Sequence, residues 1–157
     1  MAGIPQRHFA TDMFDIHEYT QDPEALRRAL APMVDDPGVV HNPIHKPVCH
    51  RNRFHGQPFW VSEYGGTFWN PEEPGGWGYG DTPQSEEEFA ERYAGLTSVL
   101  MEHPRVCGFC YTQLTDIEQE QNGLYKFDRS RKFSDAVYER IRETNLKLSW
   151  FEIHSNT

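Results

Sequence analysis

The chain has 157 residues, a formal net charge of −9 at pH 7 and an isoelectric point near 5.3. It carries no basic stripe that could neutralise phosphates, which argues against a nucleic-acid partner. No run of about 18 apolar residues occurs, so no membrane partner is predicted. The N-terminal residues lack the apolar stretch of a secretory signal, and we expect a cytoplasmic protein.

The first predicted unit is a strand followed by a helix. Residues 12–17 have the pattern of a short strand. Asp22 is a suitable N-cap, and Pro23 fits the first position of the helix that follows it.

Two further units repeat this order. Residues 58–64 and 106–111 are predicted strands. Ser85 and Glu88 form a capping box at the start of an amphipathic helix, and Ser134 opens a third helix. The order strand–helix, three times over, predicts an α/β fold made of three βα units.

Long loops cover residues 35–57, 65–84 and 112–131. The last two directly follow predicted strands and the connection after the second helix is short, whereas residues 35–57 lie between the first helix and the second strand. This asymmetry is typical of barrel units whose site is built from the loops after the strands. We treat 1–157 as one segment, in which residues 146–157 are either a terminal strand or an extended tail.

The end of the second strand is the most informative stretch of the chain. The apolar run Phe59-Trp60-Val61 brings one carboxylate, Glu63, to the strand end, where the chain breaks at Gly65-Gly66. A strand end that opens into a glycine turn is where an α/β barrel presents catalytic groups. Glu63 is therefore the primary candidate for a catalytic residue, against the alternative of a structural salt bridge.

Two motifs carry a family resemblance. Trp60-Val-Ser-Glu-Tyr-Gly-Gly66 and the stretch from Cys110 to Tyr125 resemble the C-terminal part of the catalytic barrel of glycoside hydrolase family 2, which includes β-galactosidases and β-glucuronidases. Asp15–Tyr19 also resembles the family strand that precedes the nucleophile strand. The resemblance implies a (β/α)8 TIM barrel, with the nucleophile position on Glu63.

Chain length and the resemblance together imply a partial barrel. A complete barrel of this type needs about 250 residues, so 157 residues hold roughly its last three βα units. In the family, the acid/base carboxylate follows an Asn in an Asn-Glu pair, and this sequence contains no Asn-Glu dipeptide. We therefore expect the chain alone to lack the acid/base residue and to be inactive.

Seven residues are predicted to bind substrate, because aromatic faces stack on sugar rings while polar groups bond to hydroxyls. His17 and Tyr19 are placed to donate to hydroxyls, and Asp116 either binds hydroxyls or fixes its loop. Trp69 and Trp77 lie in a glycine-rich loop, where they are expected to be exposed for stacking. The remaining two are Tyr111, where many family members have Trp, and Gln113.

Histidines and cysteines give no metal prediction. His41, His45, His50 and His55 would share a helix face, but Pro43 and Pro47 forbid a helix there. Cys107 and Cys110 lie within a strand pattern and are expected to be buried reduced thiols. We expect no cofactor and no metal.

The leading hypothesis is a segment of a retaining β-glycosidase that hydrolyses O-glycosidic bonds of β-galactosides or β-glucuronides. One alternative is a non-catalytic carbohydrate-binding fragment, and another is a subunit whose partner chain carries the acid. Three βα units leave open strand edges, so a homo-oligomer or the rest of a larger barrel is the expected partner.

Overall fold

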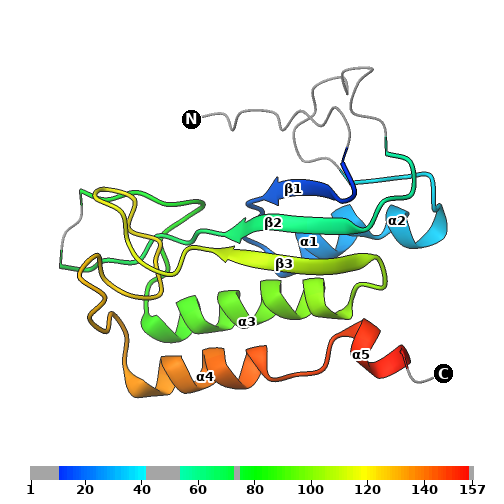
Figure 1. Cartoon of the computed structure of the whole chain (residues 1–157). Coiled ribbons are helices and arrows are strands. Elements are labelled where there is room, and N and C mark those ends of the chain that lie inside the picture. Colours follow the sequence, from blue (N-terminus) through cyan, green and yellow to red (C-terminus); the bar gives the residue numbers. More distant parts are fainter. Residues whose placement is uncertain (1–10, 42–53, 73–74, 156–157) are drawn as a thin grey trace.

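Three parallel strands form the centre of the fold (Figure 1). The computed structural model describes residues 11–41, 54–72 and 75–155. The strands β1 (Phe14–Glu18), β2 (Phe59–Gly65) and β3 (Val106–Thr112) pair in that order. Each strand is followed along the chain by helical structure. These elements confirm the predicted α/β class and the three βα units, and the described residues form an open sheet rather than a closed barrel.

In the described parts of the chain, five helices accompany the strands, and local sequence accounts for where several of them begin. Asp22 caps the first helix by accepting a hydrogen bond from the Ala25 amide at 2.6 Å, and Pro32 begins the second. Ser85 caps the third helix through the Glu88 amide at 3.2 Å. The helices are α1 (Pro23–Leu30), α2 (Pro32–Asp35), α3 (Glu86–Glu102), α4 (Asp135–Asn145) and α5 (Trp150–His154).

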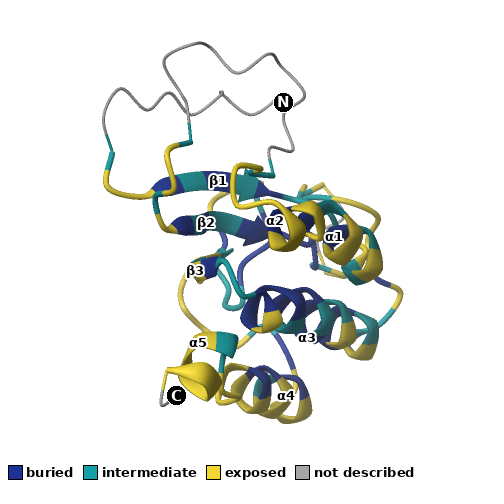
Figure 2. Ribbon diagram, turned by 90° about the vertical axis from the view of Figure 1, so that its right-hand side faces the viewer, coloured by how far each residue is buried: buried dark blue, intermediate teal, exposed yellow. Residues whose placement is uncertain are grey.

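Helices α1, α2 and α3 lie on one side of the sheet, α4 packs on the outer side of α3, and α5 lies beyond the β3 edge (Figure 2). Alternate residues of β1 point toward this helical layer, as the pleat of a strand requires. Asp15 and His17 point to the other side, which no described helix covers. The main core consists of Phe14, Ile16, Leu26, Leu30, Met33, Phe59, Val61, Tyr64, Leu96, Val99, Leu100 and Val106.

Two expectations about the chain need correction. Residues 146–157 do not form a strand or an extended tail throughout, since Trp150–His154 is a short helix with a capping box between Ser149 and Glu152. Cys107 and Cys110 are exposed rather than buried. They lie in β3, an edge strand, and no described strand pairs with its outer side.

The loops after β2 and β3 meet at the C-terminal ends of the strands (Figure 1). Their backbones pair through Trp77 and Glu120, and the Trp69 amide donates to the Gln121 carbonyl at 3.1 Å. This edge of the sheet is therefore built from segments far apart in sequence. Among the described residues, no helix is long and apolar enough to cross a membrane.

Candidate active site

Glu63 lies at the end of β2, next to a shift in strand register. The pairing of β1 with β2 shifts between Ile16 and His17, so that His17 lies opposite Glu63. Such irregularities re-aim side chains and are common beside active sites. The next residue, Tyr64, is buried in the core, with its hydroxyl 2.7 Å from Thr97 Oγ1. Adjacent positions of β2 therefore carry a tyrosine that is buried in the core and a carboxylate that is half exposed.

Two side chains from β1 and the residue after it hold Glu63. The Tyr19 hydroxyl donates to Glu63 Oε2, and His17 Nδ1 lies 3.1 Å from the same oxygen. Oε1 receives neither contact, and the Glu63 side chain is 39% exposed. The carboxylate is thus oriented through one oxygen, which leaves the other able to face a ligand.

The proton on Tyr19 is firmly held. Burial, followed by hydrogen bonding to Glu63 and then to Tyr79, raises the pKa of Tyr19 well above its ordinary value. The phenol consequently remains a hydrogen-bond donor at any physiological pH. Both His17 and Tyr19, which the sequence placed on sugar hydroxyls, contact Glu63 in the structure.

Three aromatic rings extend from the site. Tyr79 stacks on Tyr19 with ring centroids 3.5 Å apart and planes 6° apart, and the Trp77 ring meets Tyr79 edge-on at 6.0 Å. Trp77 is 41% exposed, as expected for a stacking residue. Tyr79 was not predicted as a site residue. The sequence signal that could have identified Tyr79 is its alternation with Trp77 between glycine residues.

Trp69 and Tyr111 are packed against other aromatic rings. Trp69 is only 8% exposed and stacks on Phe133 at 6.3 Å, so the prediction that it is exposed for stacking is wrong. Phe133, which approaches the α4 N-terminus, covers the Trp69 ring, a long-range contact that loop composition does not reveal. Tyr111 is half-buried, with its ring centroid 5.5 Å from that of Tyr64 and 5.0 Å from that of Tyr93.

Gln113 and Asp116 belong to the internal hydrogen bonding of the third loop. Gln113 Nε2 donates to Asn122 Oδ1 at 2.9 Å. Asp116 is buried, and its Oδ1 accepts from the Gly123 amide at 2.8 Å and from Lys132 Nζ at 2.7 Å. Of the two roles left open for Asp116, these contacts correspond to fixing the loop.

Gln21 connects the strand ends around Glu63. Its Nε2 donates to the carbonyls of Gly65 at 2.5 Å and Tyr19 at 3.1 Å, while Thr67 Oγ1 donates to its Oε1 at 2.6 Å. These bonds tie the turn after β2 to the segment after β1. Gln21 therefore supports both the carboxylate and the tyrosine that holds it.

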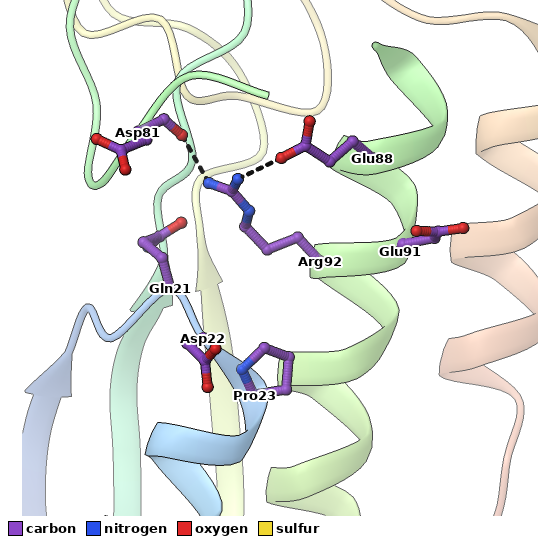
Figure 3. A pocket seen from close by; sticks show the side chains of 7 residues that line it. All are labelled: Gln21, Asp22, Pro23, Asp81, Glu88, Glu91 and Arg92. Atoms are coloured by element: carbon purple, nitrogen blue, oxygen red, sulfur yellow. Dashed lines mark hydrogen bonds and ion pairs between the residues drawn. The ribbon is translucent and has the colours of Figure 1, made fainter. Parts of the chain in front are cut away.

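Gln21 also lines a hollow of about 430 Å³ between the segment after β1 and α3 (Figure 3). Arg92 on α3 crosses it, donating to the Asp81 carbonyl at 2.7 Å and to Glu88 at 2.8 Å. The arginine thereby attaches the end of the glycine-rich loop to α3. The lining residues are Gln21, Asp22, Pro23, Asp81, Glu88, Glu91 and Arg92.

A buried ion pair that was not predicted lies at the end of β1. Glu18 is 2% exposed, and its Oε2 is 2.5 Å from His41 Nε2. Burial would raise the pKa of Glu18, but hydrogen bonds from His41 and Thr20 outweigh it and hold the pKa below its ordinary value. His45 and His50 lie outside the described residues. Within the described ranges, no group of three acidic, histidine or cysteine side chains is arranged to hold a metal ion.

Comparison with known proteins identifies a shared fold. No protein-family model and no curated protein matches the chain. It is similar to the β-glucuronidase of Ruminococcus gnavus, with a TM-score of 0.56 and 14% identity over 87% of this chain and 22% of that one. It is also similar to Bifidobacterium dentium β-glucuronidase complexed with coumarin-3-O-glucuronide, with a TM-score of 0.52 and 19% identity over 88% of this chain and 21% of that one.

A third neighbour is Bacteroides uniformis β-glucuronidase 2 covalently bound to cyclophellitol-6-carboxylate aziridine, with a TM-score of 0.54 and 18% identity over 87% of this chain and 16% of that one. The chain thus spans about a fifth of the length of these solved structures. At such low identity, the likeness establishes that the α/β arrangement is shared with a part of glycoside hydrolases.

Proposed function

We propose that the chain is the nucleophile-bearing segment of a retaining β-glycosidase, the C-terminal part of a family 2 (β/α)8 barrel. The observation that carries this proposal is Glu63, a half-exposed carboxylate at a strand end with only one oxygen held by Tyr19 and His17. The fold shared with part of several β-glucuronidases supports it. So does the covalent inhibitor on one of these neighbours, because a retaining mechanism passes through a covalent intermediate.

In the proposed reaction, Glu63 Oε1 attacks the anomeric carbon of a β-glycoside, and the bond to the aglycone oxygen breaks. The aglycone leaves with a proton from a second carboxyl group, and water then hydrolyses the glycosyl ester. Tyr19 and His17 orient the nucleophile through Oε2. Trp77 provides a flat exposed ring for the sugar or the aglycone.

The second carboxyl group belongs, in this proposal, to another part of the assembly. A retaining pair is about 5 Å apart, and we assign none of the described carboxylates to that role. Asp15 accepts from Ser62 at 2.8 Å, and Glu18 is buried against His41. The isolated chain should therefore not hydrolyse ordinary aryl β-glycosides.

Mechanism-based trapping tests the nucleophile without requiring the acid. The probes are 2,4-dinitrophenyl 2-deoxy-2-fluoro-β-galactoside and its glucuronide counterpart, because dinitrophenolate departs unprotonated and fluorine slows hydrolysis of the ester. We expect one probe to add a single glycosyl mass, mapped by peptide mass spectrometry to Glu63. The reactive probe then identifies the sugar class.

Two outcomes would contradict this function. A label on a different carboxylate would remove Glu63 from the mechanism. Saturable quenching of Trp77 fluorescence by sugars, with no label from either probe, would favour the alternative of a non-catalytic carbohydrate-binding fragment. The exposure of Trp77 is the observation that supports this second candidate function.

The sheet edges suggest how the fold is completed. β1 and β3 are the edge strands of the three-stranded sheet, and exposed edges recruit further strands. We propose that the chain joins either another copy or a complementary chain through these edges. Sedimentation velocity over a tenfold concentration range tests self-association, and a folded monomer throughout would exclude the homo-oligomer.

A further inference from the structure

Tyr79 stacks on the ring of Tyr19, the residue whose hydroxyl holds Glu63. The rings of Tyr19 and Tyr79 lie face to face, with centroids 3.5 Å apart and planes 6° apart. The hydroxyl at the end of the Tyr19 ring donates a hydrogen bond to Glu63 Oε2. A ring confined by such a stack cannot swing its hydroxyl away without losing the contact, so Tyr79 limits where the hydroxyl of Tyr19 can lie.

The turn after β2 is shaped to receive the Tyr79 ring. The Tyr79 amide donates to the Gly66 carbonyl at 2.8 Å, and Gly66 has a φ of +64°. A Cβ at Gly66 would lie 2.6 Å from Tyr79 Cδ2, closer than atoms can approach. Glycine at this position therefore supplies both the backbone conformation and the space for the ring.

The loop after β3 holds Tyr79 from the other side. Trp77, whose ring meets Tyr79 edge-on, donates from its amide to the Gln119 carbonyl at 2.7 Å and accepts from the Gln121 amide at 3.0 Å. The segment that carries Tyr79 is thus fixed by backbone bonds to the turn after β2 and to the loop after β3. These bonds hold the backbone from which the Tyr79 ring projects onto Tyr19.

We propose that Tyr79 is a positioning residue that acts through Tyr19, holding the Tyr19 hydroxyl on Glu63 Oε2 and so fixing the orientation of the carboxylate. Its catalytic consequence rests on the proposed role of Glu63 as nucleophile. The contact itself does not, and it is open to a test without substrate.

The test follows the Tyr19 hydroxyl near neutral pH, through the ζ-¹³C chemical shift in the whole chain labelled with ζ-¹³C tyrosine, with the resonance assigned through Tyr19→Phe. We expect Tyr79→Leu and Glu63→Gln each to move this resonance toward that of free tyrosine, because each weakens the hydrogen bond from the phenol to a charged carboxylate. Tyr79→Phe keeps the stacking ring and removes the hydroxyl, so it should move the resonance less than Tyr79→Leu. Tyr79→Met replaces Tyr79→Leu if that variant does not fold.

A double-mutant cycle separates positioning from simple shielding. If Tyr79 acts through the Tyr19–Glu63 contact, Tyr79→Leu should move the Tyr19 resonance much less in the Glu63→Gln background. Equal changes in both backgrounds would mean that Tyr79 only covers Tyr19, and would overturn the proposal. An unchanged resonance in Tyr79→Leu would overturn it as well.

Covalent trapping then measures the catalytic consequence. Tyr19→Phe and Tyr79→Leu should each slow labelling of Glu63 about tenfold, the size expected for one lost charge-assisted hydrogen bond. The double variant should label no more slowly than Tyr19→Phe alone, whereas a direct substrate contact by Tyr79 would make the effects multiply. If the wild-type chain is not labelled, the nucleophile proposal fails, while the chemical shift of Tyr19 still decides the positioning contact.

Discussion

Two carboxylates lie at the same end of the sheet in different environments. Glu63, after β2, is 39% exposed in its side chain and has one oxygen held by Tyr19 and His17. Asp116, after β3, is buried and bonded to a backbone amide and to Lys132. The first is oriented but still accessible, whereas the second is enclosed by its partners. The difference shows that the donor set and the exposure, rather than the residue type, separate an accessible carboxylate from an enclosed one.

Glu63→Gln should give the largest change in reactivity. The amide cannot form the glycosyl ester, so labelling by the reactive fluoro-glycoside should fall by at least about a thousandfold. The free energy of unfolding should change by less than about 1 kcal/mol, since the side chain is partly solvated. Intact-mass kinetics and urea denaturation measure the two quantities.

The matched control for this variant is Glu139→Gln. Glu139 is an exposed carboxylate that pairs with Arg142 on α4, the helix that packs on the outer side of α3. It should leave labelling at the wild-type rate. If the Glu63→Gln chain were still labelled at a rate within tenfold of wild type, Glu63 would not be the labelled group. The contrast between an accessible Glu63 and an enclosed Asp116 would then say nothing about reactivity.

Asp116→Ala should give the largest loss of stability. The substitution leaves the buried Lys132 ammonium without its carboxylate, which costs about 3–5 kcal/mol. Replacing both partners, as in Asp116→Ala with Lys132→Met, should recover a large part of the loss, because no charge then remains buried. Urea denaturation of the two variants tests this, and a loss below about 1 kcal/mol in Asp116→Ala would mean that Asp116 does not fix the loop.

Local sequence signals were sufficient for the three strands, for the helices that begin after Asp22, Ser85 and Ser134, and for the position of Glu63 near the end of β2. The caps at Asp22 and Ser85 act within a few residues, and the structure has helices beginning directly after both. The strand ending at Glu63 and the glycine turn that follows are also local features. These predictions held because each depends on neighbouring residues rather than on packing between distant segments.

The environment of each site residue depended on contacts that no short window contains. Tyr79 meets Tyr19 across 60 positions of sequence, and Trp69 is covered by Phe133 from beyond the third loop. The exposure of Cys107 and Cys110 follows from the position of β3 at the sheet edge, which depends on strand order. Loop composition predicted aromatic binding groups but did not distinguish a covered ring from an exposed one.

Trp69 and Trp77 extend the same contrast to aromatic residues of one loop. Trp69→Ala should cost about 3 kcal/mol or more, because it empties a site packed against Phe133 and Phe89. Trp77→Ala should cost about 1 kcal/mol, since the residue is 41% exposed and leaves no enclosed cavity. Urea denaturation measures both, and acrylamide quenching of single-Trp variants should reach Trp77 far more readily than Trp69. Equal quenching would show that the two rings share one environment.

Glu18 gives the smallest expected effect, one that depends on pH. Hydrogen bonds from His41 and Thr20 outweigh burial and hold the pKa of Glu18 below its ordinary value, so the folded state binds this proton less readily than the unfolded state. The resulting stability is present above the unfolded pKa and is lost as the pH falls through the folded one. Glu18→Gln should therefore cost about 1 kcal/mol near neutral pH, with the difference from wild type narrowing between about pH 5 and 3. Urea denaturation of both chains across that range is the measurement. A gap that stays constant as the pH falls would mean that the ionised form of Glu18 contributes nothing to folding, and that His41 contacts it without stabilising its charge.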